Sequence, residues 1–352
     1  LVTLFATAQS YIAVHYFRRT SLRGQSCFIL VMRRIFNHDR HDKTLVLTSH
    51  DVLFLGQQPQ QTGRPQLMDK PTQLGLFLFF IGSTMGYKHL CLIFGCTPTV
   101  CSRVITSMLK LVVKKLKRHP LARVQWPDEE KMAEYAQLIH QREPAVDDVI
   151  GFMDGVSLTS ECTSELLVQN SMYSGTTVTH GNNLLAYAPD GKVIFCAINF
   201  PGSWHDGSIA ANVLPYIRKK IGTYKMCVDQ ALPECDAVDV LVGPISHAQA
   251  YRLAPNLRPY LLRLSNVYVS LCQASEWGMR GLQGTFPRCK KRLPGNSFKR
   301  KLVIQSIVLV HNFRTETVGL NQIKTVFDPE YENYISLSGY DRIRRFYFQD
   351  DN

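Results

Sequence analysis

The spacing of apolar residues predicts one or two amphipathic helices over residues 1–35, a polar linker over residues 36–70, and further helices after it. From Pro71 the pattern predicts a helix whose apolar face spans Leu74 to Ile81, and Gly82-Ser83 ends it. A second, short helix is predicted over Tyr87 to Phe94, with Gly95 directly after it as the kind of residue that ends a helix. The sequence therefore predicts two helices separated by a break.

A third helix is predicted to start with Thr97 as its N-cap and Pro98 at its first position, which is a favoured pairing. It runs to about Lys117 and follows the glycine turn closely. Two helices joined by a tight turn that contains glycine are typical of a helix-turn-helix, although a plain helical hairpin fits the same pattern. The candidate DNA contacts on the third helix are Arg103, Lys110, Lys114 and Lys115.

An acidic residue ends the next apolar run. A further helix is predicted from Trp126 to about Arg142, and it is followed by the run from Val149 to Met153, which stops at Asp154. A carboxylate in such a run is costly to bury unless another group pairs with it. Because Asp-Gly is also a common turn dipeptide, this residue is either a turn residue or a metal ligand on a central strand.

Strand-like segments follow on both sides of a turn. Residues 183–188 and 192–198 are predicted strands, and Pro189-Asp190-Gly191 between them is a strong hairpin signal. The first three strands are therefore expected to run antiparallel. The third leads into a loop that contains His205 and Asp206, and a helix is predicted to follow it.

Two more acidic residues complete a recurring order. A short strand over residues 224–229 ends on Asp229, and a helix predicted over residues 266–282 carries Glu276. Three strands, a helix, a fourth strand and a late helix, with acids on strands one and four and on the late helix, are the RNase H-like order. The predicted fold is α/β (α+β): an RNase H-like mixed sheet flanked by helices and preceded by an all-α helix-turn-helix region.

Three converging carboxylates are suited to two-metal chemistry. Two divalent ions about 3.5–4 Å apart require hard oxygen ligands from separate elements, and they assist both the attacking and the leaving oxygen. Simpler roles remain open for each acid, because Glu276 fits a solvated helix position and Asp229 fits a helix cap.

Charge and cysteine content add to this prediction. The chain has 352 residues and a formal net charge of +12, which favours a polyanionic partner, nucleic acid first. Its ten cysteines include no C-x-x-C pair. Cys91, Cys96 and Cys101 lack zinc-finger spacing and are predicted to be reduced, mostly buried thiols, with a zinc site as the weaker alternative. The most apolar stretch, Leu74 to Ile81, is too short to span a bilayer, so no membrane partner is expected.

The residues resemble the PIF/Harbinger DDE transposases and the nucleases derived from them. The resemblance covers roughly residues 72 to 315 and rests on an ordered set of segments. These are LFLFFIGS, LCLIFGCTPTVCSRVI, MDGV, NLLAYAPDGKV, NFPGSWHDGS, CVDQALP, SLCQASEWGMRGLQGTF and VLVHNFRT. It implies that Asp154, Asp229 and Glu276 are the catalytic, metal-binding triad, with Asp206 as a further candidate metal ligand and His205 in support.

The resemblance also implies cofactors and partners. The expected ion is Mg²⁺, with Mn²⁺ able to substitute, and the expected substrate is DNA at transposon terminal repeats and target sites. A separate Myb-like DNA-binding protein and a nuclear location are implied as well, and a homo-oligomer is an open alternative.

Three positions depart from the family pattern. Such proteins usually carry Gly or Ala where this chain has Val228, an aromatic residue where it has Leu232, and Arg where it has Cys272. An Arg at that last position holds a carboxylate or phosphate in a way that a thiol cannot reproduce. The alternative to an active endonuclease is therefore a catalytically impaired or domesticated copy that binds DNA or protein. A cellular RNase H-like nuclease acting on RNA hybrids is a weaker alternative, because of the predicted helix-turn-helix.

A second basic segment follows the late helix. Its candidate DNA contacts are Arg288, Lys290, Lys291 and Arg292, and residues 299–301 are basic too. A nuclear-localisation patch or a solvated charge run fits equally well. The predicted division of the chain is an N-terminal helical segment and linker over 1–70, a helical region over 71–145, the nuclease domain over 146–315, and a tail over 316–352.

Overall fold

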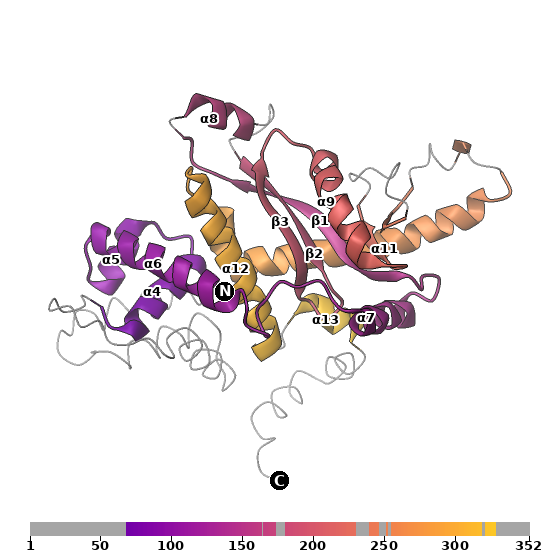
Figure 1. The fold of residues 1–352 in the computed structure, drawn as a ribbon, viewed down its shortest axis with the longest axis horizontal. Helices are drawn as coiled ribbons and strands as arrows, with labels where there is room; N and C mark the ends of the chain where they lie inside the picture. Colours follow the sequence, from indigo (N-terminus) through magenta and orange to yellow (C-terminus); the bar gives the residue numbers. More distant parts are fainter. Residues whose placement is uncertain are drawn as a thin grey trace, which may run out of the picture. The chain divides into compact units, whose positions relative to one another are not determined.

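The structure is a computed structural model, and it describes residues 68–163, 165–173, 180–229, 239–245, 251–252, 255–318 and 321–328. The predicted segment 1–70 lies almost entirely outside these residues, as do Leu232 and most of the predicted tail. The chain forms two compact units (Figure 1). The first comprises residues 1–123, 159–163 and 282–319, and the second comprises residues 124–158, 164–281 and 320–352.

The first unit contains a helix that is apolar from Leu74 to Ile81. Helix α4 (Lys70–Ile81) is capped by Asp69, whose carboxylate accepts a hydrogen bond from the Thr72 N–H. Its residues from Leu74 to Ile81 are buried on every side, as expected for a helix that is hydrophobic all round. The predicted break at Gly82 is observed as the C-cap of this helix.

Helices α5 (Tyr87–Phe94) and α6 (Pro98–Leu116) are joined by a short turn that contains glycine. Gly95 adopts the left-handed conformation with φ 60°, which ends α5, and the Thr97 hydroxyl accepts a hydrogen bond from the Val100 N–H. The two helix axes are bent by 97°, an angle compatible with the predicted helix-turn-helix. No single helix in the described part of the chain is both long enough and apolar enough to cross a membrane.

A late helix completes the first unit. Helix α12 (Ser297–Val318) packs against α6, and the Ser306 hydroxyl donates to the Leu109 carbonyl. The sequence places this helix at the end of the nuclease domain, whereas its contacts group it with α4 to α6. A short 3-10 helix, η1 (Pro287–Lys290), belongs to the same unit.

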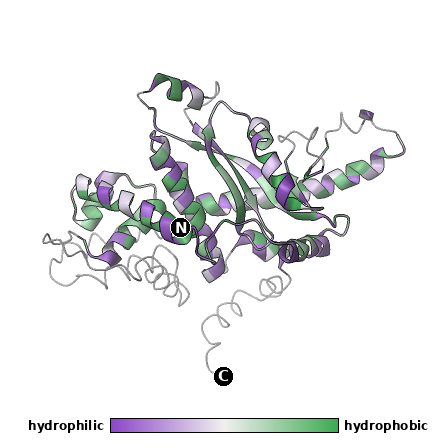
Figure 2. Cartoon of the chain, in the orientation of Figure 1, coloured by the Kyte–Doolittle hydropathy of each residue, from purple (hydrophilic) through white to green (hydrophobic). Residues whose placement is uncertain are grey.

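The second unit is built on a five-stranded mixed sheet. Its strands are β1 (Val149–Thr159), β2 (His180–Tyr187), β3 (Val193–Pro201), β4 (Lys225–Val228) and β5 (Leu241–Val242). Their order is β3-β2-β1-β4-β5, with β2 and β3 antiparallel and β4 parallel to both β1 and β5. This order confirms the predicted RNase H-like fold class, and Figure 2 shows how hydrophobic the central strands are.

Helices cover both faces of this sheet. On one face, α7 (Glu129–Arg142) and α9 (Asp206–Ile221) share a buried cluster with the strands, in which Tyr135 and Ile217 meet Met153 and Val228. On the other face lie α11 (Arg258–Thr285) and α13 (Gln322–Phe327). The Phe327 ring of α13 packs against Phe152 of β1 with ring centroids 5.0 Å apart.

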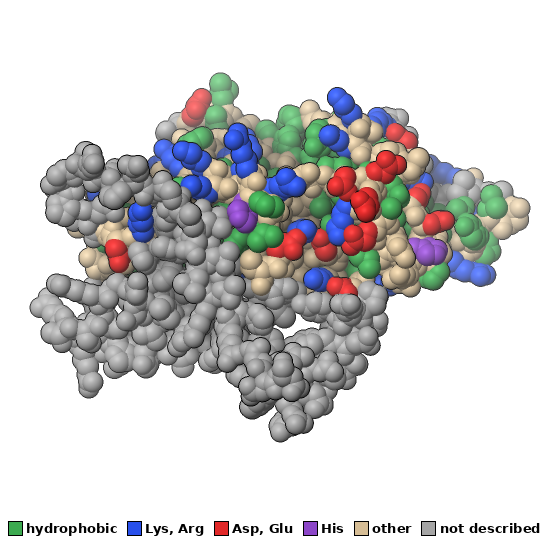
Figure 3. Space-filling model, turned by 60° about the horizontal axis from the view of Figure 1, so that its bottom comes forward, with side chains coloured by type: hydrophobic (Ala, Val, Ile, Leu, Met, Phe, Trp, Pro, Cys, Tyr) green, Lys and Arg blue, Asp and Glu red, His purple; other side chains and the backbone are tan. Residues whose placement is uncertain are grey.

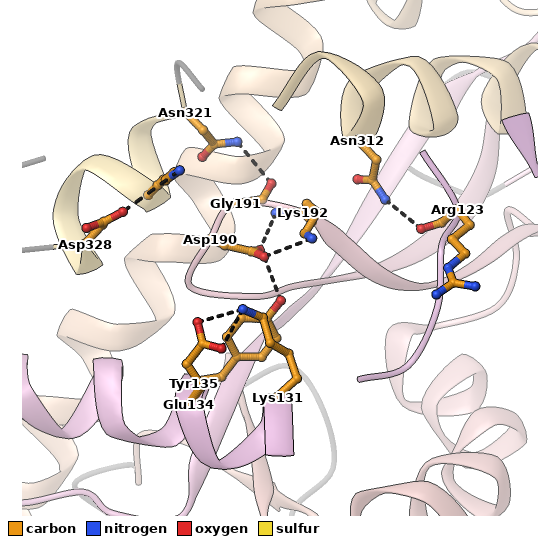
Figure 4. A network of polar contacts seen from close by, with 11 residues as sticks. Arg123, Lys131, Glu134, Tyr135, Asp190, Gly191, Lys192, Asn312, Asn321 and Asp328 are labelled. Atoms are coloured by element: carbon orange, nitrogen blue, oxygen red, sulfur yellow. Dashed lines mark hydrogen bonds and ion pairs between the residues drawn. The ribbon is translucent and has the colours of Figure 1, made fainter. Parts of the chain in front are cut away.

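The hairpin between β2 and β3 is held from two other elements (Figure 4). The Tyr135 hydroxyl donates to the Asp190 carboxylate over 2.6 Å, and the Asn321 amide donates to the Gly191 carbonyl over 3.0 Å. Gly191 has φ +81°, and a Cβ atom there would lie 2.2 Å from the Asn321 side chain. Both the backbone conformation and the space therefore require glycine at this predicted turn.

Candidate active site

The register of two parallel strands places Asp154 and Asp229 side by side. Met153 of β1 pairs with Val228 of β4, and each aspartate is the next residue along its strand direction. Neighbouring strands lie about 4.8 Å apart, so Asp154 in the middle of β1 and Asp229 just after β4 are direct neighbours. Asp154 is half-buried and Asp229 is exposed.

Both aspartates belong to the face of the sheet that α11 covers. Successive side chains of a strand point to opposite faces, and both Met153 and Val228 point into the cluster under α7 and α9. The residues that follow them therefore point towards the other face. Cys227, two residues before Asp229, contacts α11 on that face, because its Sγ atom lies 3.2 Å from Sγ of Cys272.

Helix α11 places Glu276 near the end of β4, which carries Asp229. The Cys272 thiol donates to the Val228 carbonyl over 3.0 Å, so this turn of the helix touches the residue just before Asp229. Glu276 lies one helical turn further on, at the margin of the buried face, and its side chain is 57% exposed. Its carboxylate pairs with Arg280 over 2.9 Å.

The three proposed ligands lie on neighbouring elements but are not drawn tightly together. Among the residues that the structure describes, Cys91, Cys96 and Cys101 form the one group of three His, Cys, Asp or Glu ligand atoms that all lie within 4.8 Å of one another. The carboxylates of Asp154, Asp229 and Glu276 do not reach that spacing. The Asp154 carboxylate instead accepts a hydrogen bond from the Gly155 N–H over 2.7 Å.

The local environment of the thiols near Asp229 is apolar and crowded. Cys227 and Cys272 are both buried. The hydrogen bond with Cys272, followed by burial and the nearby charge of Asp229, raises the pKa of the Cys227 thiol. Cys272 is a buried packing residue at the position where the resembling family carries Arg.

The loop that carries His205 leads directly into α9. His205 is exposed and is the N-cap residue of α9, and Asp206 is the first residue of the helix. The side chain of Asp206 lies outside what the structure describes. Trp204 is partly exposed. Its ring stacks on the Phe200 ring, with ring centroids 5.7 Å apart.

Two buried amides, which the sequence analysis missed, hold this loop. The Asn182 side chain donates to the Trp204 carbonyl over 2.7 Å and accepts a hydrogen bond from the Ser157 hydroxyl over 2.6 Å. The neighbouring Asn183 donates to the Val156 carbonyl of β1 and accepts from the Asn199 N–H of β3. Two consecutive amides inside an apolar strand were the available signal, because a buried amide is normally hydrogen-bonded.

Most of the predicted DNA contacts are available on the surface of the first unit. Arg103, Lys110, Lys114, Lys290, Lys291 and Arg292 are exposed, and Lys115 is half-buried. On the face drawn in Figure 3, acidic side chains gather on one part of the surface, with Lys and Arg side chains among them.

Arg288 is a correction to the predicted DNA-binding set. Its side chain is buried, with the guanidinium carbon 4.2 Å from the centre of the Phe80 ring and Nη1 donating to the Met85 carbonyl. Burial lowers the pKa of the guanidinium, and its Nε atom has no hydrogen-bond partner among the described residues. This arginine anchors η1 to α4 and is not available to a phosphate.

The segment that contains all three acids has a match among known families. Residues 153–312 match the family described as DDE superfamily endonuclease. The match begins one residue before Asp154, includes Asp229 and Glu276, and ends in α12. It supports a DDE transposase-like family for this chain.

Comparison with individual proteins adds little to this match. No curated protein sequence matches the chain. A chain in the crystal structure of the Mos1 strand transfer complex has 12% sequence identity to this protein, with a TM-score of 0.21. The alignment covers 74% of this chain and 84% of the Mos1 chain. A pre-cleavage Mos1 transpososome is 11% identical over 75% and 81%, with a TM-score of 0.19. The fold assignment therefore rests on the strand order of this chain.

The donor set suits a hard divalent cation. Carboxylate oxygens are the ligands that Mg²⁺ and Mn²⁺ prefer, and two of the three come from adjacent strands, Asp154 from the middle of β1 and Asp229 from just after β4. Glu276 is exposed on the third element, so its side chain has room to change rotamer towards them. The residues that would hold the cation are Asp154, Asp229 and Glu276.

Proposed function

We propose that this protein is a metal-dependent DNA endonuclease of the transposase type, which cleaves phosphodiester bonds at transposon ends. One observation carries the proposal: the pairing of Met153 with Val228 sets Asp154 beside Asp229, on the sheet face where α11 brings Glu276. Within the family match, these are the acids on the first strand, the fourth strand and the late helix.

Each of the three acids has a distinct part in this proposal. Asp154 would bind the cation from the middle of β1 and Asp229 from the end of β4, and Glu276 would complete the site from α11. Divalent cations bound in this way activate the attacking water or 3′-hydroxyl and stabilise the leaving oxygen. The Asn182 hydrogen bonds fix the loop that ends in His205, which makes Asn182 a positioning residue for that histidine.

Arg280 sets the resting position of Glu276. The ion pair between them is solvent-exposed, and such pairs contribute little to stability. A cation at the two aspartates would compete with Arg280 for the Glu276 carboxylate. The pair therefore holds the third ligand near the site without fixing it there.

The finer assignment follows the resemblance stated from the sequence. We propose a PIF/Harbinger-type enzyme that uses Mg²⁺, with Mn²⁺ as a substitute, and that acts in the nucleus on DNA terminal repeats and target sites. Strand transfer, a Myb-like partner protein and a homo-oligomer belong to the same proposal. DNA would be bound in part by α6, whose exposed basic residues follow the turn of the predicted helix-turn-helix.

The test is cleavage of supercoiled plasmid DNA by the full chain with Mg²⁺ or Mn²⁺, followed by gel analysis. The expected result is metal-dependent nicking that Asp154→Asn and Asp229→Asn both abolish. Asp148→Asn is the matched control. Asp148 is an acid at the opposite end of the same strand pair, where it forms an ion pair with Lys225 over 2.7 Å. Equal cleavage by Asp154→Asn and the wild type would overturn the proposal.

A second candidate function is a catalytically impaired copy that binds DNA without cutting it. The buried Cys272 favours it. This residue lies beside the end of β4, at the position where the resembling family carries an Arg side chain. Loss of a supporting residue around a metal site typically costs 10–100-fold in affinity or activity. Metal-independent DNA binding with no nicking by the wild type would favour this alternative.

A further inference from the structure

Three thiols of the predicted helix-turn-helix come together although their spacing in the sequence does not suggest it. The Sγ atoms of Cys91, Cys96 and Cys101 all lie within 4.8 Å of one another. Cys101 is buried, and the other two are half-buried. They come from the end of α5, from the turn and from the first turns of α6.

The backbone of the turn produces this arrangement. The Cys91 carbonyl accepts hydrogen bonds from the N–H groups of both Gly95 and Cys96, which turns the chain back over the end of α5. The Cys101 N–H donates to the Thr97 carbonyl over 2.9 Å, so this cysteine faces the turn from one helical turn inside α6. The left-handed Gly95 makes this compact reversal possible.

We propose that Cys91, Cys96 and Cys101 bind Zn²⁺ as three thiolates, with the fourth position open to an exchangeable ligand. Zinc–sulfur bonds of about 2.3 Å in a tetrahedral site separate neighbouring sulfur atoms by about 3.8 Å. The observed limit of 4.8 Å admits that separation with small rotamer changes. No fourth Cys, His, Asp or Glu ligand atom joins this group within the described residues.

The chemistry of the cluster favours a soft cation. Thiolates are soft ligands, and among divalent cations Zn²⁺ binds them readily. Three adjacent thiolates would repel one another without a cation between them. Zinc offsets two of their three charges, and the positive end of α6 stabilises the remaining one.

The site would also strengthen a weak element. Helix α5 has eight residues, below the length at which an isolated helix is stable, and Leu90 is its one fully buried residue. A cation bound by all three cysteines would join α5, the turn and α6. It would thereby fix the 97° bend between the two helices.

The test is metal titration of the full chain, with any affinity tag removed and the thiols reduced by a phosphine. Co²⁺ is the optical probe. We expect one equivalent to give the ligand-field bands of a tetrahedral site and a thiolate-to-cobalt charge-transfer band. Zn²⁺ should displace it and raise the melting temperature, because a cation that binds only the folded state stabilises it.

Variants separate this site from a structural thiol cluster and from the carboxylate site. Cys96→Ser is the main variant, because Cys96 is half-buried in the turn and its loss spares the helix interiors. It should lose both the charge-transfer band and the zinc-induced rise in melting temperature. Cys289→Ser, which changes a buried cysteine outside the cluster, should keep both, and so should Asp154→Asn. Absence of zinc binding by the wild type, or unchanged binding by Cys96→Ser, would overturn the proposal.

Discussion

The Cys272 thiol of α11 donates a hydrogen bond to the Val228 carbonyl of β4, 3.0 Å away, and Val228 directly precedes Asp229. The same sulfur atom lies 3.2 Å from Sγ of Cys227. Helix α11 is therefore seated on the strand end that carries one proposed ligand, while it carries another itself. The two buried cysteines are in direct contact, so a larger side chain at either position would be overpacked.

Cys272→Arg is expected to destabilise the protein and not to restore activity. Overpacking a well-packed position costs about 1–3 kcal/mol, and an unpaired buried guanidinium adds to that cost. Urea unfolding followed by circular dichroism measures the change. Cys272→Ala, which removes the thiol without adding volume, serves as the control and should cost less. A stable Arg variant with higher nicking activity would show that this position alone limits catalysis.

Asn182→Ala is expected to lower the free energy of unfolding by about 1–3 kcal/mol, because it removes the hydrogen bonds of a buried amide and leaves the Trp204 carbonyl without its donor. It should also reduce nicking activity through displacement of the His205 loop. The control is Asn212→Ala, which removes an amide that donates to the Ser208 carbonyl on the exposed side of α9. Equal stability of the two variants would contradict the proposed role of Asn182.

Arg288 and Lys291 should respond in opposite ways to replacement by Met. Arg288→Met removes a buried hydrogen bond to Met85 and should lower stability with little direct effect on DNA affinity. Lys291→Met removes an exposed charge and should leave stability unchanged. If Lys291 contacts a phosphate, its loss should reduce the slope of log affinity against log salt by about 1. Fluorescence anisotropy with labelled duplex DNA measures this slope, and an unchanged slope would remove Lys291 from the interface.

The Cys289 thiol should make stability depend on alkaline pH. Burial raises its pKa from 9.0 to about 12, so the unfolded chain releases this proton near pH 9 while the folded chain keeps it. The stability present below pH 9 is therefore lost as the pH rises towards 12, by about 1.4 kcal/mol per pH unit. Over this range the unfolding free energy of the wild type should fall relative to that of Cys289→Ala. A difference that does not change with pH would mean that the Cys289 thiol has the same pKa in the folded and the unfolded chain.

Local signals explain which parts of the fold could be predicted. The helix boundaries at Gly95, Thr97 and Pro98 are predicted correctly, because capping interactions involve only a few neighbouring residues. Asp154 could be placed on the first strand because an apolar run precedes it. Strand β5 was missed, since its two residues have no periodicity and owe their conformation to pairing with β4.

Long-range contacts explain the rest. Arg288 lies in a basic run that predicts exposure, but its burial depends on the Phe80 ring, which is far away in the sequence. The cysteine cluster depends on the left-handed turn at Gly95, which cysteine spacing does not reveal. Separate residues on β1, β4 and α11 could be identified from their order, but the ion pair that turns Glu276 towards Arg280 could not.

The interleaving of the two units constrains how this protein can be dissected. The chain passes between them at residues 123/124, 158/159, 163/164, 281/282 and 319/320, so neither unit is one continuous segment. A fragment starting at residue 146 would lose Tyr135 and the rest of α7 from the core of the sheet. It would also retain α12 without α6, its packing partner. Activity or inactivity of such a fragment would thus report on an exposed core and not on the chemistry of the three acids.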